Sequence, residues 1–140
     1  MTKELDVRVI QEAVRSKFAE AAHSSEGKFK YPTGRAGAIA LGYDPLVVGD
    51  MPDDLLESFC GVGNPFSLGP INPGEGILDV GCGAGFDLIV ASRFVGTTGR
   101  VCDIDLTPEI VERVQMNLRR AGVSNGAVHL EDTNEWHPVP

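Results

Sequence analysis

Three alternating glycines and the acid before them are the residues of this sequence best suited to bind a ligand. Gly81, Gly83 and Gly85 follow a short apolar run that contains Asp79, and a helical pattern begins directly after them. Glycines at such a turn let backbone N–H groups and a helix N-terminus approach a ligand closely. A carboxylate at the same place is unfavourable beside a pyrophosphate and favourable beside an ammonium group. The stretch therefore predicts a cradle for a zwitterionic ligand.

The spacing of these glycines does not fit the dinucleotide fingerprint. That motif, Gly-x-Gly-x-x-Gly, would place its last glycine at position 86, where this chain has Phe86. A tight strand-to-helix turn that binds nothing is the other interpretation of a lone glycine-rich stretch. Further residues of the sequence are needed to decide between the two.

Two later acids favour the ligand. Asp105 ends an apolar run and lies roughly 20 residues beyond the glycine turn, as does the acid that binds ribose hydroxyls in nucleoside-binding βαβ units. Asp132 follows a third such run. The carboxyl ends of parallel strands meet at one edge of a sheet, so Asp79, Asp105 and Asp132 are expected along that edge. Together with the cradle they predict an adenosyl ligand.

A helix cap is the alternative role for Asp105. The next helix begins near Pro108, and a residue just before a helix often accepts hydrogen bonds from its first N–H groups. Thr107 stands in the capping position itself, with proline after it at the first helical position. We therefore expect Thr107 to cap this helix and Asp105 to remain available for ribose.

The elements that position these acids can be read from apolar periodicity. Strands are predicted where apolar runs are short, and helices where apolar residues recur every three or four positions. The strands are expected at 77–80, 100–105 and 127–130, and the helices at 88–95 and 110–121. Gly122 suits the end of the second helix. The pattern predicts an α/β fold, the first β-α-β-α-β half of a Rossmann-like parallel sheet.

The residues before this half predict a helical segment. Apolar residues recur at helical spacing from 5 to 22, and this amphipathic helix is expected to pack rather than to take part in chemistry. In the polar loop that follows, Phe29 or Tyr31 could cover a ligand, although surface packing is the more ordinary role.

Three further stretches lead up to the first strand. The apolar patch 36–41 is expected to close in a turn, and 51–59 to form a brief helix that ends at Gly61. The stretch 60–70 is rich in glycine and proline, so we expect it to be an irregular loop that could roof the site.

Composition limits the partners. The 140 residues are 42% hydrophobic, which suits one modest core, and carry 20 acidic against 12 basic side chains for a net charge of −8. Such a balance makes nucleic acid a poor partner. We find no apolar run long enough for a membrane and no leader pattern at the N-terminus, so we expect a cytoplasmic protein.

The three cysteines do not predict a metal site. Cys60, Cys82 and Cys102 lie far apart, without a Cys-x-x-Cys motif or histidines at zinc-finger spacing. We expect Cys82 and Cys102 to be small buried side chains.

The stretch from Asp79 to Gly85, with Asp105 and Asp132 after it, resembles the class I methyltransferases that use S-adenosylmethionine (SAM). The resemblance covers 73 to about 140. It implies that the glycine turn, with Cys82, holds the methionine end of SAM and that Asp105 holds the ribose. It also implies that Leu106 packs on adenine, that Asp132 accepts from the adenine amino group and that Thr133 offers its backbone N–H to the ring.

Four further stretches, at 60–66, 83–87, 95–101 and 105–109, look like the arsenite methyltransferase branch of that family. Those enzymes carry a cysteine within a Gly-Cys-Gly-Asn-Pro segment, and this chain has Val62 at the matching position, with Cys60 as the nearby thiol. Trivalent arsenic is held by several thiolates. Either Cys60 substitutes, or the acceptor is a different small molecule, which we favour slightly because relatives on one scaffold differ chiefly in their loops.

The sequence thus predicts a SAM-dependent methyltransferase for a small-molecule acceptor, and a homo-oligomer is possible. We assign no catalytic residue, because direct attack on the methyl group needs no general base. A non-catalytic SAM-binding fragment and a nucleotide-binding oxidoreductase domain are the alternatives. We divide the chain into a helical cap and substrate-loop segment, 1–72, and the first half of the SAM domain, 73–140. The family continues into a fourth strand that pairs with the first, so these residues are expected to need that strand, the N-terminal segment or a second copy to complete the sheet.

Overall fold

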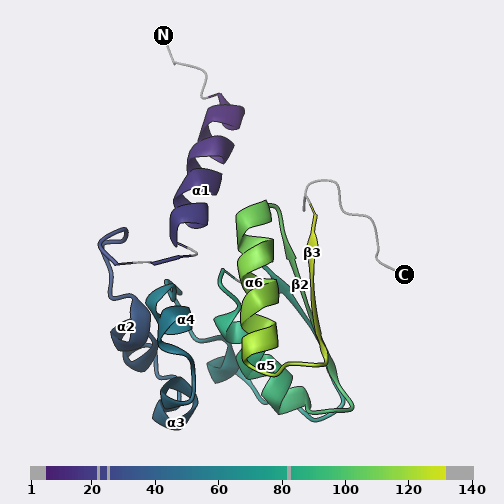
Figure 1. Ribbon diagram of the computed structural model, residues 1–140. Helices are drawn as coiled ribbons and strands as arrows, with labels where there is room; N and C mark the ends of the chain where they lie inside the picture. Colours follow the sequence, from purple (N-terminus) through teal and green to yellow (C-terminus); the bar gives the residue numbers. More distant parts are fainter. Residues whose placement is uncertain (1–5, 22, 25, 82, 132–140) are drawn as a thin grey trace.

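A three-stranded parallel sheet with two crossover helices forms the second half of the chain, and in the described residues four α-helices and one 3-10 helix precede it (Figure 1). The computed structural model describes residues 6–21, 23, 24, 26–81 and 83–131. The elements in chain order are α1 (Val7–Ala21), α2 (Gly34–Ala40), α3 (Pro45–Gly49), α4 (Asp53–Glu57), the 3-10 helix η1 (Pro65–Leu68), β1 (Gly76–Val80), α5 (Phe86–Val95), β2 (Arg100–Asp105), α6 (Pro108–Arg120) and β3 (Gly126–Leu130). The predicted Rossmann-like α/β fold after a helical N-terminal segment is confirmed.

The sheet has the order β1-β2-β3, with β2 in the centre. Ile77 lies opposite Val101 in the β1–β2 pair, and Asp103 lies opposite Val128 in the β2–β3 pair. Val101, Asp103 and Val128 share one face by this register, and all three are buried. Val101 and Val128 belong to one hydrophobic cluster with buried residues of α5 and α6, so these helices cover this face of the sheet.

The other face of the sheet is more open. Leu78 is 55% exposed and Val80 57% exposed, and β1 lies at the edge of the sheet. Among the described residues no further strand pairs with β1, and the N-terminal segment supplies helices rather than a strand.

The helices α2 to α4 join the same core as the sheet. Buried residues of this segment, among them Val48, Leu55 and Phe59, belong to one hydrophobic cluster with Leu88 and Val114 of α5 and α6. Figure 1 shows α2, α3 and α4 grouped together, with α1 extending away from them.

Helix α1 differs from the packing element that we expected. Its apolar stripe is exposed to a large extent: Val7 is 62%, Val14 50% and Phe18 39% exposed, and Ala21 is the buried residue of the helix. The helix forms, but the described part of the chain does not bury its stripe in the core.

The apolar patch expected at 36–41 belongs to helix α2, which has no side-chain cap, whereas local capping explains two other elements that were not predicted, α3 and η1. The expected turn after residue 41 contains α3, because Asp44 accepts a hydrogen bond from the Leu46 N–H (2.9 Å) and Pro45 opens the helix. The loop 60–70 is not wholly irregular, because Asn64 caps η1 in the same way by accepting from the Phe66 N–H (3.1 Å). The helix expected at 51–59 is shorter than predicted, running from Asp53 to Glu57.

Candidate functional site

A cavity of about 460 Å³ lies at the carboxyl ends of β1 and β2. Its volume is within the usual range for small-molecule sites. Five of the residues predicted to bind the cofactor line it, namely Asp79, Gly81, Gly83, Asp105 and Leu106. The structure therefore brings together residues that lie in two separate strand-to-helix junctions.

The glycine turn has the backbone conformation that requires glycine. Gly81, Gly83 and Gly85 all have positive φ values, 77°, 59° and 94°. A Cβ added at Gly81 or Gly83 would meet nothing within 4 Å, so the space beside these two residues is open to a ligand. Gly85 differs, because a Cβ there would lie 3.2 Å from Cγ1 of Val114. Gly85 does not line the cavity and instead allows α6 to pack against the turn.

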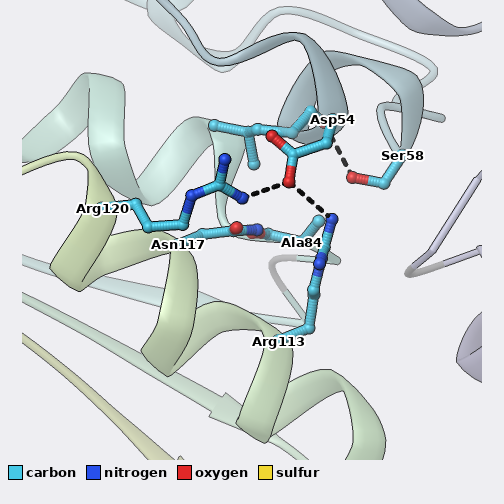
Figure 2. A network of polar contacts seen from close by, with 7 residues as sticks. Asp54, Ser58, Ala84, Arg113, Asn117 and Arg120 are labelled. Carbon is cyan, nitrogen blue, oxygen red and sulfur yellow. Dashed lines mark hydrogen bonds and ion pairs between the residues drawn. The ribbon is translucent and has the colours of Figure 1, made fainter.

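An amide on α6 holds the same turn. The Nδ2 group of Asn117 donates a hydrogen bond to the carbonyl oxygen of Ala84 at 2.8 Å, and Asn117 is buried (Figure 2). This bond satisfies a backbone carbonyl of a turn that has no regular ladder. Asn117 thus fixes the cradle from behind, a contact that no periodicity in the sequence indicated.

The two acids of the strand ends differ in their local bonds. Asp105 is 7% exposed, and its Oδ1 accepts a hydrogen bond from the Thr107 N–H at 2.9 Å. Thr107 takes the expected cap position of α6 but makes no side-chain bond to the helix, and its own N–H donates to the Asp105 carboxylate. Asp105 therefore supports the turn while it faces the cavity.

Burial raises the pKa of both carboxyl groups. Desolvation is the main cause of the raised pKa of Asp79, and the charge of Asp105 raises it further. Desolvation also raises the pKa of Asp105, against the lowering effect of its hydrogen bonds with Thr107. A carboxylate held in such a place is stabilised by a cation or by hydroxyl donors.

A third acid, Asp87, lines the cavity from the first turn of α5. Its Oδ1 accepts a hydrogen bond from the hydroxyl of Tyr43, a buried residue between α2 and α3. Burial raises the pKa of Asp87 to about 6, the Tyr43 bond lowers it and the charge of Asp79 raises it. The sequence analysis assigned no role to Asp87. Two signals were available, its place two residues after the third glycine and its position at the end of the stretch 83–87 that resembles the arsenite methyltransferases.

The outer wall of the cavity comes from the N-terminal segment. Ile10, Val14 and Phe18 of α1 line it, as do Phe59 and Cys60 after α4. The exposed stripe of α1 thus faces the cavity instead of the core. The stretch 60–70 was predicted to roof the site. Its first two residues, Cys60 and Gly61, line the cavity as part of this wall.

An ion-pair network joins this wall to the Rossmann half (Figure 2). Oδ2 of Asp54 on α4 accepts from Arg113 of α6 at 3.2 Å and also from Arg120 of α6. The Asp54 pKa is lowered, chiefly by the hydrogen bond from Arg120. Because Ser58 and the cavity wall follow α4 directly, this network positions the wall relative to α6.

Other residues named from the sequence lie elsewhere. Cys82, Asp132 and Thr133 are outside the described residues. Phe29 and Tyr31 do not line the cavity, although the Tyr31 hydroxyl donates to the Cys60 carbonyl oxygen at 2.8 Å. Cys102 is half-buried, and Val62 is 80% exposed.

The thiol of Cys60 lies in the cavity wall, and burial raises its pKa. Within the described ranges, no group of three or more histidine, cysteine or acidic side chains could hold a metal ion. No helix in the part of the chain that the structure describes is long and apolar enough to cross a membrane.

Comparison with known families gives one match. The family model of the protein-L-isoaspartate(D-aspartate) O-methyltransferases matches residues 63–138, more than half of the chain. This range begins before β1 and contains the glycine turn and both described strand-end acids.

Two similar proteins extend the comparison. The arsenite methyltransferase of Halobacterium salinarum is 31% identical to this chain. The match spans 89% of this chain and 35% of that protein. The protein-L-isoaspartate O-methyltransferase of Pyrococcus horikoshii is 37% identical over 51% of this chain, which covers 31% of that protein. The chain spans about a third of the length of these curated relatives.

Among solved structures, the [4+2]-cyclase SpnF has a TM-score of 0.51 at 18% identity, covering 96% of this chain and 44% of that one. This likeness concerns the fold alone. A shared fold does not fix the reaction, so function follows from the residues of the site.

Proposed function

Because the chain belongs to the protein-L-isoaspartate(D-aspartate) O-methyltransferase family of SAM-dependent methyltransferases, we propose that its cavity binds SAM for methyl transfer to a small-molecule acceptor. One observation carries the proposal. The open glycine turn and the acids of two neighbouring strands line a single cavity. A zwitterion linked to a ribose has a complement in each part of this arrangement.

Each part of the site has a proposed ligand group. The backbone at Gly81, Cys82 and Gly83, with the Asp79 carboxylate, would hold the methionine end, while Gly85 shapes the turn. Asp105 would accept from the ribose hydroxyls, and Leu106, which is 37% exposed beside it, offers an apolar surface to the adenine. We keep Asp132 and Thr133 as the proposed adenine partners on the strength of the family resemblance.

The residues present fit this cofactor on physical grounds. Addition of a Cβ at Gly81 or Gly83 would fill space that is open, and two carboxylates with raised pKa values face that space. A bound sulfonium cofactor supplies an activated methyl group that a nucleophile can take directly. What the chain contributes is binding, orientation of the two reactants and exclusion of water. We assign no catalytic residue, since an acceptor that is already ionised attacks the methyl carbon directly as S-adenosylhomocysteine leaves, and no general base is then required.

The acceptor is proposed to be a small organic molecule, with arsenite as the alternative. The match to an arsenite methyltransferase reaches into the N-terminal segment, which supports the alternative. Cys60, however, is the one thiol among the described cavity residues, and Val62 faces solvent rather than the cavity. Ile10, Val14 and Phe18 offer an apolar wall instead, which suits an organic acceptor better than an arsenic that needs several thiolates.

The division into a cap and substrate-loop segment, 1–72, and a SAM-binding half, 73–140, remains part of this proposal. It is supported by the position of the cavity between α1, the residues after α4 and the strand ends. The cytoplasmic location and a homo-oligomeric state likewise remain predictions.

Transfer of label from methyl-labelled SAM tests the proposal on the complete protein. The acceptor panel contains arsenite, small aromatic amines and phenols, and an isoaspartyl peptide. We expect labelled product with an organic acceptor. Label in arsenite alone would establish the alternative acceptor, label in the peptide alone would refute a small-molecule acceptor, and SAM binding without transfer to any acceptor would favour a cofactor-binding role without turnover.

A further inference from the structure

Asp87 is the acid of the cavity that the proposed roles leave unused. It lies in the first turn of α5, directly after the glycine turn, and lines the same cavity as Asp79 and Asp105. One of its oxygens, Oδ1, accepts the hydroxyl of Tyr43. The orientation of its carboxyl group is therefore set by a residue far away in the sequence.

The position of the Tyr43 hydroxyl is itself fixed. Tyr43 is 4% exposed, and its ring packs edge-on against Phe86 and Phe59, with ring centroids 5.0 and 5.6 Å apart. The same hydroxyl lies 3.4 Å from the carbonyl oxygen of Gly63. A ring held this tightly gives its hydroxyl little freedom, so the bond to Asp87 orients the carboxylate rather than following it.

The charges around Asp87 call for a cation. The described residues that line the cavity include three acids, Asp79, Asp87 and Asp105, and one basic residue, Arg15 of α1. Tyr43, which bonds Asp87, and Cys60, which lines the same cavity, are further titratable groups, and neither carries a positive charge. Carboxylates gathered in a partly buried space repel one another unless a cation lies between them.

We propose that Asp87, oriented by Tyr43, binds the cationic methionine end of the cofactor together with Asp79. This inference rests on the proposed function, since it adds a residue to the same cofactor site. Asp87 contacts the ligand, and Tyr43 is a positioning residue. Because Tyr43 precedes α3, the N-terminal segment takes part in cofactor binding and not only in covering the acceptor.

Asp87→Asn tests the contact. The substitution removes the charge but keeps an oxygen that can accept the Tyr43 hydroxyl. Calorimetry would compare SAM, S-adenosylhomocysteine and methylthioadenosine, of which the last keeps the adenine and ribose but lacks the amino-acid end. We expect SAM affinity to fall roughly tenfold or more, as for a lost hydrogen bond to a charged group. Methylthioadenosine should bind as in the wild type, which also shows that the variant is folded.

The second ligand identifies the cation. Equal losses for SAM and S-adenosylhomocysteine would place Asp87 beside the ammonium group, which both ligands carry. A loss for SAM alone would place it beside the sulfonium, which S-adenosylhomocysteine lacks. Either result supports binding of the cationic end.

Tyr43→Phe tests the positioning role through the pH profile. Wild-type SAM affinity should be full above the Asp87 pKa of about 6 and fall as the pH drops through it. The hydroxyl lowers that pKa, so its removal should shift the fall to higher pH. Tyr31→Phe removes a hydroxyl that bonds the Cys60 carbonyl instead, and it should leave the profile unchanged.

Two outcomes would overturn the inference. One is SAM affinity in Asp87→Asn equal to that of the wild type. The other is a pH profile in Tyr43→Phe that coincides with that of the wild type, which would reduce Tyr43 to a packing residue. If the wild type bound no SAM at all, the proposed function would fail instead, so the two failures are distinguishable.

Discussion

At the scale of single residues, Asp105 combines two tasks that the sequence analysis treated as alternatives. It bonds the Thr107 N–H at the start of α6, and it also lines the cavity where ribose is proposed to bind. A carboxylate has two oxygens and several acceptor sites, so one oxygen can support the turn while the other serves a ligand. Asp105 thus holds the turn before α6, with Thr107 in the cap position, and keeps an oxygen for the ribose.

Asp105→Asn separates the two tasks, because the amide oxygen can still accept the Thr107 N–H while the charge is lost. We expect SAM, S-adenosylhomocysteine and methylthioadenosine all to bind more weakly by about 1–3 kcal/mol, since all three carry the ribose hydroxyls. Calorimetry gives the affinities, and thermal unfolding should show little change. Wild-type affinity for all three ligands would leave Asp105 with the turn as its sole task.

Gly81 and Gly122 form a matched pair for the glycine turn. Both have positive φ values, 77° and 70°, and a Cβ at either would meet nothing within 4 Å. Alanine should therefore destabilise the fold by roughly 1–2 kcal/mol at each position through backbone strain. Gly81→Ala should also weaken SAM binding, because its methyl group would occupy the cavity, whereas Gly122→Ala should not. Equal affinities of the two variants would contradict the assignment of this turn as the cradle.

At the scale of elements, the Asp54 network joins α4 to α6 and so positions the cavity wall. Asp54→Asn should lower the free energy of unfolding by about 1 kcal/mol, since Arg113, whose side chain is 13% exposed, loses its partner. The neighbouring Asp53→Asn is the control, because the Asp53–Arg35 pair is far more exposed.

The sign of the pH dependence follows from the lowered pKa of Asp54. A carboxyl group with a lowered folded pKa stabilises the fold above its ordinary pKa of 3.8, and this contribution is lost as the pH falls below that value. The stability difference between wild type and Asp54→Asn should therefore shrink in acid, as measured by denaturant unfolding. A difference that stayed constant down to pH 2, or one equal to that of Asp53→Asn, would show that the network does not hold the wall.

The elements of the second half were predictable because periodicity and end signals agree there. Strand β2 was predicted with its observed limits, and α6 ends before Gly122, which has the positive φ expected of a helix stop. The stretch between α1 and β1 was harder, since α2, α3 and α4 have seven residues or fewer and are too short for a period to show. Asp44-Pro45 and Asn64-Pro65 carry capping signals that would have indicated α3 and η1.

Contacts between distant residues could not be predicted at all. The bonds from Tyr43 to Asp87 and from Asn117 to Ala84 join elements that only the folded chain brings together. The stripe of α1 carries the usual pattern of a packing helix, and nothing in that pattern distinguishes a core from a cavity wall.

At the scale of the whole molecule, β1 forms one edge of the sheet and shows Leu78 and Val80 on its open face. This agrees with the expectation that, among the described residues, the first strand would have β2 on one side and no strand on the other. Such an edge favours pairing with another strand. The match covers 35% of the Halobacterium relative and 31% of the Pyrococcus relative, and the described cavity is the part of the crevice that α5, α6 and the N-terminal segment surround.

The central claim is that this crevice binds SAM, and calorimetry on the complete protein tests it most directly. The titration would use SAM and, separately, a nicotinamide dinucleotide, with wild type, Asp105→Asn and Gly122→Ala side by side. We expect SAM to bind the wild type and Gly122→Ala with the same affinity, and Asp105→Asn more weakly. We expect the dinucleotide not to bind. Binding of the dinucleotide without SAM would contradict the central claim.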